Sequence, residues 1–133
     1  MDPLSIAASA IALLEATRRI SKGLQRLIAL KRVPDLLLAL NNEMSDLQVI
    51  LTQIESFAPS IATSETHQSL NRNVALIKEK LKELEIIIYG RLMTRGGGMN
   101  RSAWLLVRDD VERIQKDIRH MRVNIGNSLH VMT

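Results

Sequence analysis

The chain has 133 residues and a net charge of +4, and this length is that of a single domain. Hydrophobic residues make up 46% of it with only one Phe, one Trp and one Tyr, so its core must be aliphatic, which favours helices over a sandwich or barrel. The absence of cysteine excludes a disulfide framework, a thiolate zinc site and a cysteine nucleophile.

The first predicted element is a helix over residues 3–30. Asp2 can cap its first turn, and Pro3 suits the first helical position, where a missing N–H costs nothing. Apolar residues then recur in alternating steps of four and three, which is the spacing of a stripe along the buried face of a helix. Its members are Ile6, Ala10, Leu13, Thr17, Ile20, Leu24 and Leu27, with Thr17 the one weak member. Gly23 lies inside this helix and predicts tight packing or a local bend.

The opening of this helix is uncharged from Pro3 to Leu14. It is too short for a membrane span, because a bilayer core needs about 20 apolar residues in a row. Its Ala and Ser residues recur four apart, so another helix could approach closely on that side, in water or in lipid. We take as the candidate effector set Leu4, Ile6, Ala8, Ile11, Ala12 and Leu14. The alternative is a plain buried core helix.

Positive charge is concentrated in the same region. Residues 1–34 hold six Lys or Arg against two acids, while residues 35–133 hold twelve of each sign. Arg18, Lys22 and Arg26, the basic stripe, recur at four-residue spacing and therefore share one helical face. A basic stripe after an apolar run fits an anionic membrane surface or an acidic partner. The alternative is an ordinary solvated face.

Three further helices follow, separated from the first by Pro34, which disfavours helix at the residue before it. They are predicted over residues 36–57, 64–90 and 109–131, and each shows the same alternation of apolar positions. An earlier turn from Ser102 is the alternative start of the last helix. In the second helix, polar residues cover the sides away from the core, namely Asn41, Asn42, Glu43, Asp46, Gln48 and Gln53.

Residues 91–101 contain three consecutive glycines and predict a long, mobile loop with no ordered element. Asp109 and Glu112 are spaced as a capping box for the last helix. Just upstream, an apolar cluster should fold over one end of the core, formed by Trp104, Leu105 and Leu106. The whole pattern predicts an all-α protein, an antiparallel up-and-down four-helix bundle formed by residues 1–133 as one domain.

No motif for catalysis is present. The glycines lack the Gly-x-x-x-x-Gly-Lys-Ser/Thr order of a phosphate loop, and no strand precedes them. A two-metal bundle would need several inward carboxylates and histidines, but only Asp117 and His120 have the required spacing. We therefore expect no enzyme, no cofactor, no metal and no small-molecule substrate. Nucleic acid is not expected as a partner either, because the basic stripe has no stacking aromatics beside it.

A series of residues resembles a known family. Its parts are the opening Met1-Asp2-Pro3-Leu4-Ser5-Ile6-Ala7-Ala8-Ser9, then Val33-Pro34, then Leu40, Glu43, Leu47 and Leu51, then Trp104 ahead of a basic amphipathic helix with Asn124 and Leu129. In this order the chain resembles the fungal HeLo-like N-terminal domain, which heads STAND proteins, the fungal NLR-like receptors. The resemblance covers nearly the whole chain, and the opening nine residues are its most specific part.

The resemblance implies a helical bundle similar to the executioner bundles of necroptosis and of plant coiled-coil receptors. Its implied role is membrane-targeted programmed cell death in fungal heterokaryon incompatibility and innate immunity, triggered when a downstream NTPase module oligomerises. We expect a cytoplasmic, self-associating domain that is recruited to the plasma membrane on activation, with anionic lipids as partners.

The leading hypothesis is that the first helix is the effector element, sheltered in the resting bundle and presented to an anionic membrane on oligomerisation. The alternative is a non-enzymatic module for protein–protein interaction or oligomerisation that never touches lipid.

Overall fold

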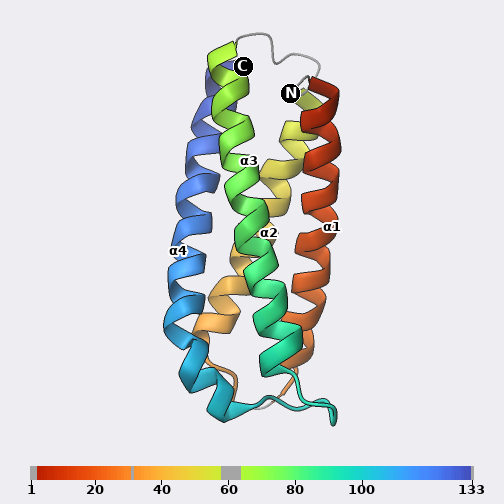
Figure 1. Ribbon diagram of the computed structural model, residues 1–133, viewed down its shortest axis with the longest axis vertical. Helices are drawn as coiled ribbons and strands as arrows, with labels where there is room; N and C mark the ends of the chain where they lie inside the picture. The colour runs from red at the N-terminus through yellow and green to blue at the C-terminus, as the bar shows by residue number, and fades with distance from the viewer. Residues whose placement is uncertain (1–2, 31, 58–63, 133) are drawn as a thin grey trace.

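The computed structural model describes residues 3–30, 32–57 and 64–132, with side chains for all of these except residues 3–5, 64–67, 131 and 132. Its four α-helices are α1 (Pro3–Ile28), α2 (Asp35–Phe57), α3 (Ser64–Glu85) and α4 (Arg101–Met132). A π-helical segment, η2 (Ile86–Leu92), continues α3. The described part of the chain forms no strand beyond one isolated bridge, which confirms the all-helical class. Figure 1 shows the helices lying side by side along the long axis.

One apolar stripe from each helix forms the core. Every member of the stripe predicted for α1 is buried, including Thr17, whose hydroxyl donates a hydrogen bond of 2.7 Å to the carbonyl of Leu14. The apolar alternation predicted for the second helix forms the buried face of α2 as well, at Leu37, Leu40, Met44, Leu47, Leu51 and Ile54. The apolar alternation in the sequence therefore identified the buried face of both helices.

The start of α4 differs from the prediction. The helix begins at Arg101, ahead of the expected capping box, because the side chain of Asn100 accepts a hydrogen bond of 3.0 Å from the amide of Ala103 and caps it. In its first turns Trp104 is buried, whereas Leu105 and Leu106 point away from the core and are among the most exposed apolar side chains described. The expectation that all three cover the core is therefore wrong for the two leucines.

The glycine-rich segment is a hydrogen-bonded turn, and the expectation that no ordered element forms there is wrong. The amide of Thr94 donates to the carbonyl of Gly98 at 3.0 Å, and the Thr94 hydroxyl accepts from the Gly98 amide at 2.9 Å. Gly97 takes a left-handed φ of 85°, which favours glycine. Met93 and Met99 form the isolated bridge on either side and pack against the core, which anchors the turn.

Gly23 is the point at which α1 touches η2, as the expectation of tight packing requires. A Cβ added at Gly23 would lie 2.8 Å from Cγ2 of Ile88 and 3.0 Å from the ring of Tyr89. Beside it, the Tyr89 hydroxyl donates a hydrogen bond of 2.5 Å to the carbonyl of Arg19. Only a residue without a side chain permits this approach of the two elements.

Gly23→Ala is expected to destabilise the protein by about 1 kcal/mol. The helix propensity of Ala would favour the change by about 1 kcal/mol, but overpacking against a stiff, buried isoleucine costs about 1–3 kcal/mol. Gly126→Ala is the matched control in α4, because its Cβ would meet Ile50 at an ordinary 3.7 Å. Chemical denaturation should show a gain of about 0.5–1 kcal/mol for the control. Equal gains for both variants would contradict the close contact.

Candidate functional site

The candidate effector set does not form one surface. Ile6 and Leu14 are buried in the core, whereas Ala8, Ile11 and Ala12 are exposed. Leu4 belongs to α1, but its side chain lies outside the described ones. Some of its members are buried and others exposed because the set was chosen as a continuous stretch of sequence. A helix of 3.6 residues per turn directs neighbouring residues of such a stretch to different sides. The six residues therefore do not share one face of the resting bundle, and their role as effector residues of a released helix stays a prediction.

The basic stripe does lie on the surface. Arg18, Lys22 and Arg26 are all exposed, and none of them forms an ion pair with another described residue. Their neighbour Arg19 behaves differently, because its Nε donates a hydrogen bond of 2.7 Å to Glu85 at the end of α3. That hydrogen bond raises the pKa of Arg19. The stripe thus keeps its full positive charge available to a partner.

An open depression lies next to the stripe, between α1 and the junction of α3 and η2. It is lined by Arg19, Lys22, Arg26, Glu85 and Tyr89. Three cations and one carboxylate meet there, and the carboxylate is already paired with Arg19. The depression therefore carries a net positive charge and suits an anionic group.

Positive charge is concentrated at one end of the bundle, which we call the basic end. It is the end where α1 finishes, α2 begins and the glycine-rich turn leads into α4 (Figure 1). Residues 16–34 and 86–108 hold ten of the eighteen Lys and Arg residues and none of the fourteen Asp and Glu residues. Nη1 of Arg101 donates a hydrogen bond of 3.1 Å to the carbonyl of Arg32 and so joins the two segments.

The sequence pattern reveals only the first of these segments as basic. Of the second, residues 91–101 are predicted as a mobile loop, and nothing in the sequence joins its arginines to those of the first helix. The lack of acidic residues in the second segment can be seen in the sequence as a composition bias. The contact between the two segments cannot be seen there, because they lie far apart in the chain.

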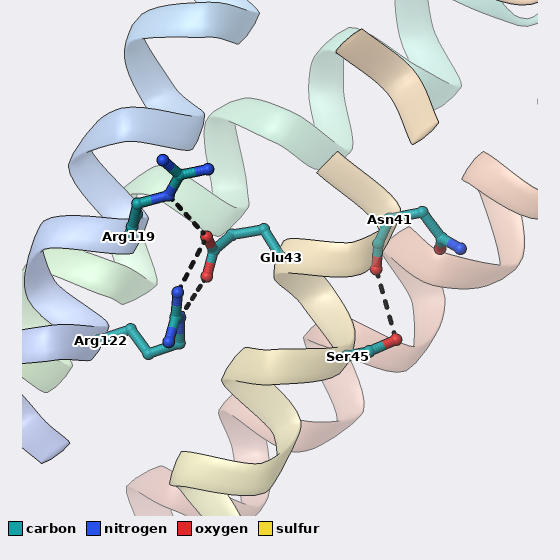
Figure 2. Close-up of polar contacts among 5 residues, drawn as sticks. All are labelled: Asn41, Glu43, Ser45, Arg119 and Arg122. Atoms are coloured by element: carbon teal, nitrogen blue, oxygen red, sulfur yellow. Dashed lines mark hydrogen bonds and ion pairs between the residues drawn. The ribbon is translucent and has the colours of Figure 1, made fainter. Parts of the chain in front are cut away.

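A buried carboxylate lies between α2 and α4 (Figure 2). Glu43 is only 3% exposed, and its oxygens accept hydrogen bonds from Nε and Nη2 of Arg122 at 2.5 and 3.4 Å. Nε of Arg119 lies 3.6 Å from the same carboxylate. The hydrogen bond to Glu43 raises the pKa of Arg122. Because both cations hold the carboxylate, this cluster ties the two helices together and leaves no free base.

Glu43 was expected on the solvated side of its helix, and that prediction is wrong. The residue directly precedes Met44, which is fully buried, and so lies at the edge of the core stripe. The signal that could have revealed its position is the pair of arginines three residues apart on α4. Such a pair presents two cations on one helical face, and a buried acid is a suitable partner.

A groove of about 350 Å³ separates the first half of α1 from α3. On the α1 side it is lined mainly by small residues of the predicted Ala and Ser series, Ser9, Ala12 and Ala16. Ala75 and Val74 line it from α3, with Lys78 at its margin. The small side chains that were expected to permit close approach of a helix therefore face a groove that α3 does not fill.

Within residues 3–30, 32–57 and 64–132 there is no group of three His, Asp or Glu that could hold a metal ion. No helix in those ranges is long and apolar enough to cross a membrane. In comparisons with known proteins, no protein-family model, no curated protein and no solved structure matches the chain.

Proposed function

We propose that this chain is the N-terminal effector domain of a fungal NLR-like receptor, as its resemblance to the HeLo-like domain implies. It binds anionic membranes through α1 and takes part in programmed cell death, without catalysis or cofactor. The observation that carries the membrane role is the exposed basic stripe, whose three cations have no described ion-pair partner. An unpaired stripe of this kind is attracted to the negative surface of a cytoplasmic leaflet.

The architecture proposed with this function is an antiparallel up-and-down bundle. It is supported by the packing of α1 on α2 and α3, and of α4 on α2 and α3. It is also supported by Figure 1, in which the start of α1 and the end of α4 lie at the same end of the molecule.

Presentation of α1 to a membrane requires its release from the bundle. Its apolar stripe is buried in the core, and the Arg19–Glu85 ion pair and the Gly23 contact hold its second half against α3 and η2. Oligomerisation is the step that would provide the free energy for release, by giving the exposed core a new partner. At rest, α1 therefore offers a membrane its basic stripe and the exposed side chains of Ala8, Ile11 and Ala12.

Reversal of the basic stripe, Arg18→Glu with Lys22→Glu and Arg26→Glu, should abolish retention on anionic vesicles in a flotation assay. Each basic residue near an anionic leaflet contributes about 1 kcal/mol, and reversal adds repulsion to that loss. The matched control makes the same charge change on exposed residues of α3, Arg72→Glu with Lys78→Glu and Lys82→Glu. Retention of the stripe variant at low salt, equal to that of the control, would disprove the membrane role of this face.

The alternative function is a protein-binding or oligomerisation module. The groove between α1 and α3 favours it, because the small side chains on its α1 wall leave space that could accept a helix from a partner or from a second copy. Absence of retention on anionic vesicles, even for an oligomer at low salt, would leave this function as the better one. A change of Ala12→Leu should then block association, since it would fill the groove.

A further inference from the structure

We propose that the basic end docks onto an anionic lipid bilayer and that Leu105 and Leu106 are the apolar side chains that enter it. The inference rests on the proposed function in taking an anionic membrane as partner. It goes beyond that function by specifying which end of the bundle contacts the membrane first and which residues anchor it there. None of these anchoring residues belongs to α1.

The two leucines stand out among the apolar side chains. Leu106 and Leu105 are 74% and 71% exposed, more than any other large hydrophobic side chain in the described ranges. They are consecutive, and they lie between Trp104 and Val107, which are both buried. The core therefore fixes the backbone on either side of them, so the pair is held outward by a rigid helix. Scattered exposed apolar residues are ordinary, but a fixed adjacent pair is a candidate contact.

The charge around the leucines is what selects a bilayer as the partner. Residues 86–108 carry four arginines and no acidic residue. Arg91 and Arg95 are exposed and form no ion pair with a described residue, and Arg108 meets only Asp109, at 3.9 Å. Arginine stems can lie in the apolar boundary of a bilayer while their guanidinium groups stay with the headgroup phosphates. On the helix, Arg101 lies one turn before Leu105 and Arg108 one turn after it, while Asp109 and Asp110 lie one turn after Leu106. An exposed apolar pair with arginines beside it matches the layered chemistry of an anionic leaflet.

The position of the leucines in the fold agrees with the basic stripe. The first turns of α4 lie at the end of the bundle where α1 finishes (Figure 1). Lys22 and Arg26, in the last two turns of α1, therefore lie toward the same end as Arg91 and Arg95. A bundle docked through this end keeps the start of α1 at the far end, away from the bilayer, until release.

Fluorescence of the wild-type chain tests this orientation directly. Trp104 is the single tryptophan and directly precedes Leu105, so its emission reports on this turn alone. The probe is a vesicle of phosphatidylcholine and phosphatidylserine in which the acyl chains carry bromine, a heavy-atom quencher that acts at short range and does not require the buried indole itself to enter the bilayer. We expect loss of Trp104 emission on these vesicles, and no loss on brominated vesicles of phosphatidylcholine alone.

A pair of matched variants tests the contribution of the leucines. Leu105→Ser with Leu106→Ser should weaken binding to phosphatidylserine vesicles about tenfold or more, because apolar area no longer leaves water. The control is Val49→Ser with Leu76→Ser, which removes exposed apolar side chains from α2 and α3 and should leave binding unchanged. Circular dichroism establishes that each variant is folded. If the leucine variant does not fold, the quenching of Trp104 in the wild-type chain tests the inference instead.

The possible failures are distinguishable. Retention on anionic vesicles without quenching of Trp104 would overturn this inference and leave the proposed function standing. Absence of any retention would overturn both. A wild-type dimer in light scattering without lipid, converted to a monomer by Leu105→Ser with Leu106→Ser, would assign the leucines to a second copy of the chain and overturn the inference as well.

Discussion

Ile20→Glu is expected to destabilise the bundle by about 4 kcal/mol or more. Ile20 is completely buried in the stripe of α1, so the change removes a large apolar side chain and places a carboxyl group in the core without a partner. A loss of this size is a large fraction of the stability of an ordinary domain. Thermal or chemical unfolding, followed by circular dichroism, should show either a much lower midpoint or no folded state.

The same substitution on the other side of α1 provides the control. Ile11 is 44% exposed, so Ile11→Glu should change the free energy of unfolding by less than about 0.5 kcal/mol. The contrast between the two isoleucines measures which face of α1 supports the fold. Similar losses for both would mean that the outer face of α1 is also covered, for example by a second copy, and that the resting protein is not a monomer.

Removal of both arginines that hold Glu43, by Arg119→Ala with Arg122→Ala, is expected to cost about 3–5 kcal/mol. Glu43 would remain buried with no cation beside it, and an uncompensated buried charge is far more costly than the loss of a surface ion pair. Urea denaturation measures the change. Adding Glu43→Leu to this variant should recover most of the loss, because the stranded charge is then removed.

The control for this variant uses two residues nearer the start of the same helix. Arg113 and Lys116 have the same three-residue spacing, and both pair with acids at the surface. Arg113→Ala with Lys116→Ala should cost no more than about 1 kcal/mol in total, since exposed ion pairs contribute little. An equal loss for the two double variants would show that the burial of Glu43 is not what makes its cluster important.

The sequence by itself determined the helical class and the buried stripes. The burial of the stripe from Ile6 to Leu27 and the tight packing at Gly23 were predicted correctly, because they depend on the period of the helix and on the properties of single residues. The extent of α4 and the turn at residues 93–99 were not, because the Asn100 cap and the anchoring of Met93 and Met99 depend on local geometry that composition hides.

The candidate site was decided by the tertiary structure. Periodicity states which residues share a side of one helix, but it does not state which sides of different helices meet. Only the packed bundle places Glu43 opposite Arg119 and Arg122, which lie on a different helix. In the same way, only the fold brings the acid-free residues 16–34 and 86–108 to one end, where their charges act on a common partner. Electrostatic and apolar surfaces depend on distances in space, and residues far apart in sequence acquire those distances only when the core has formed.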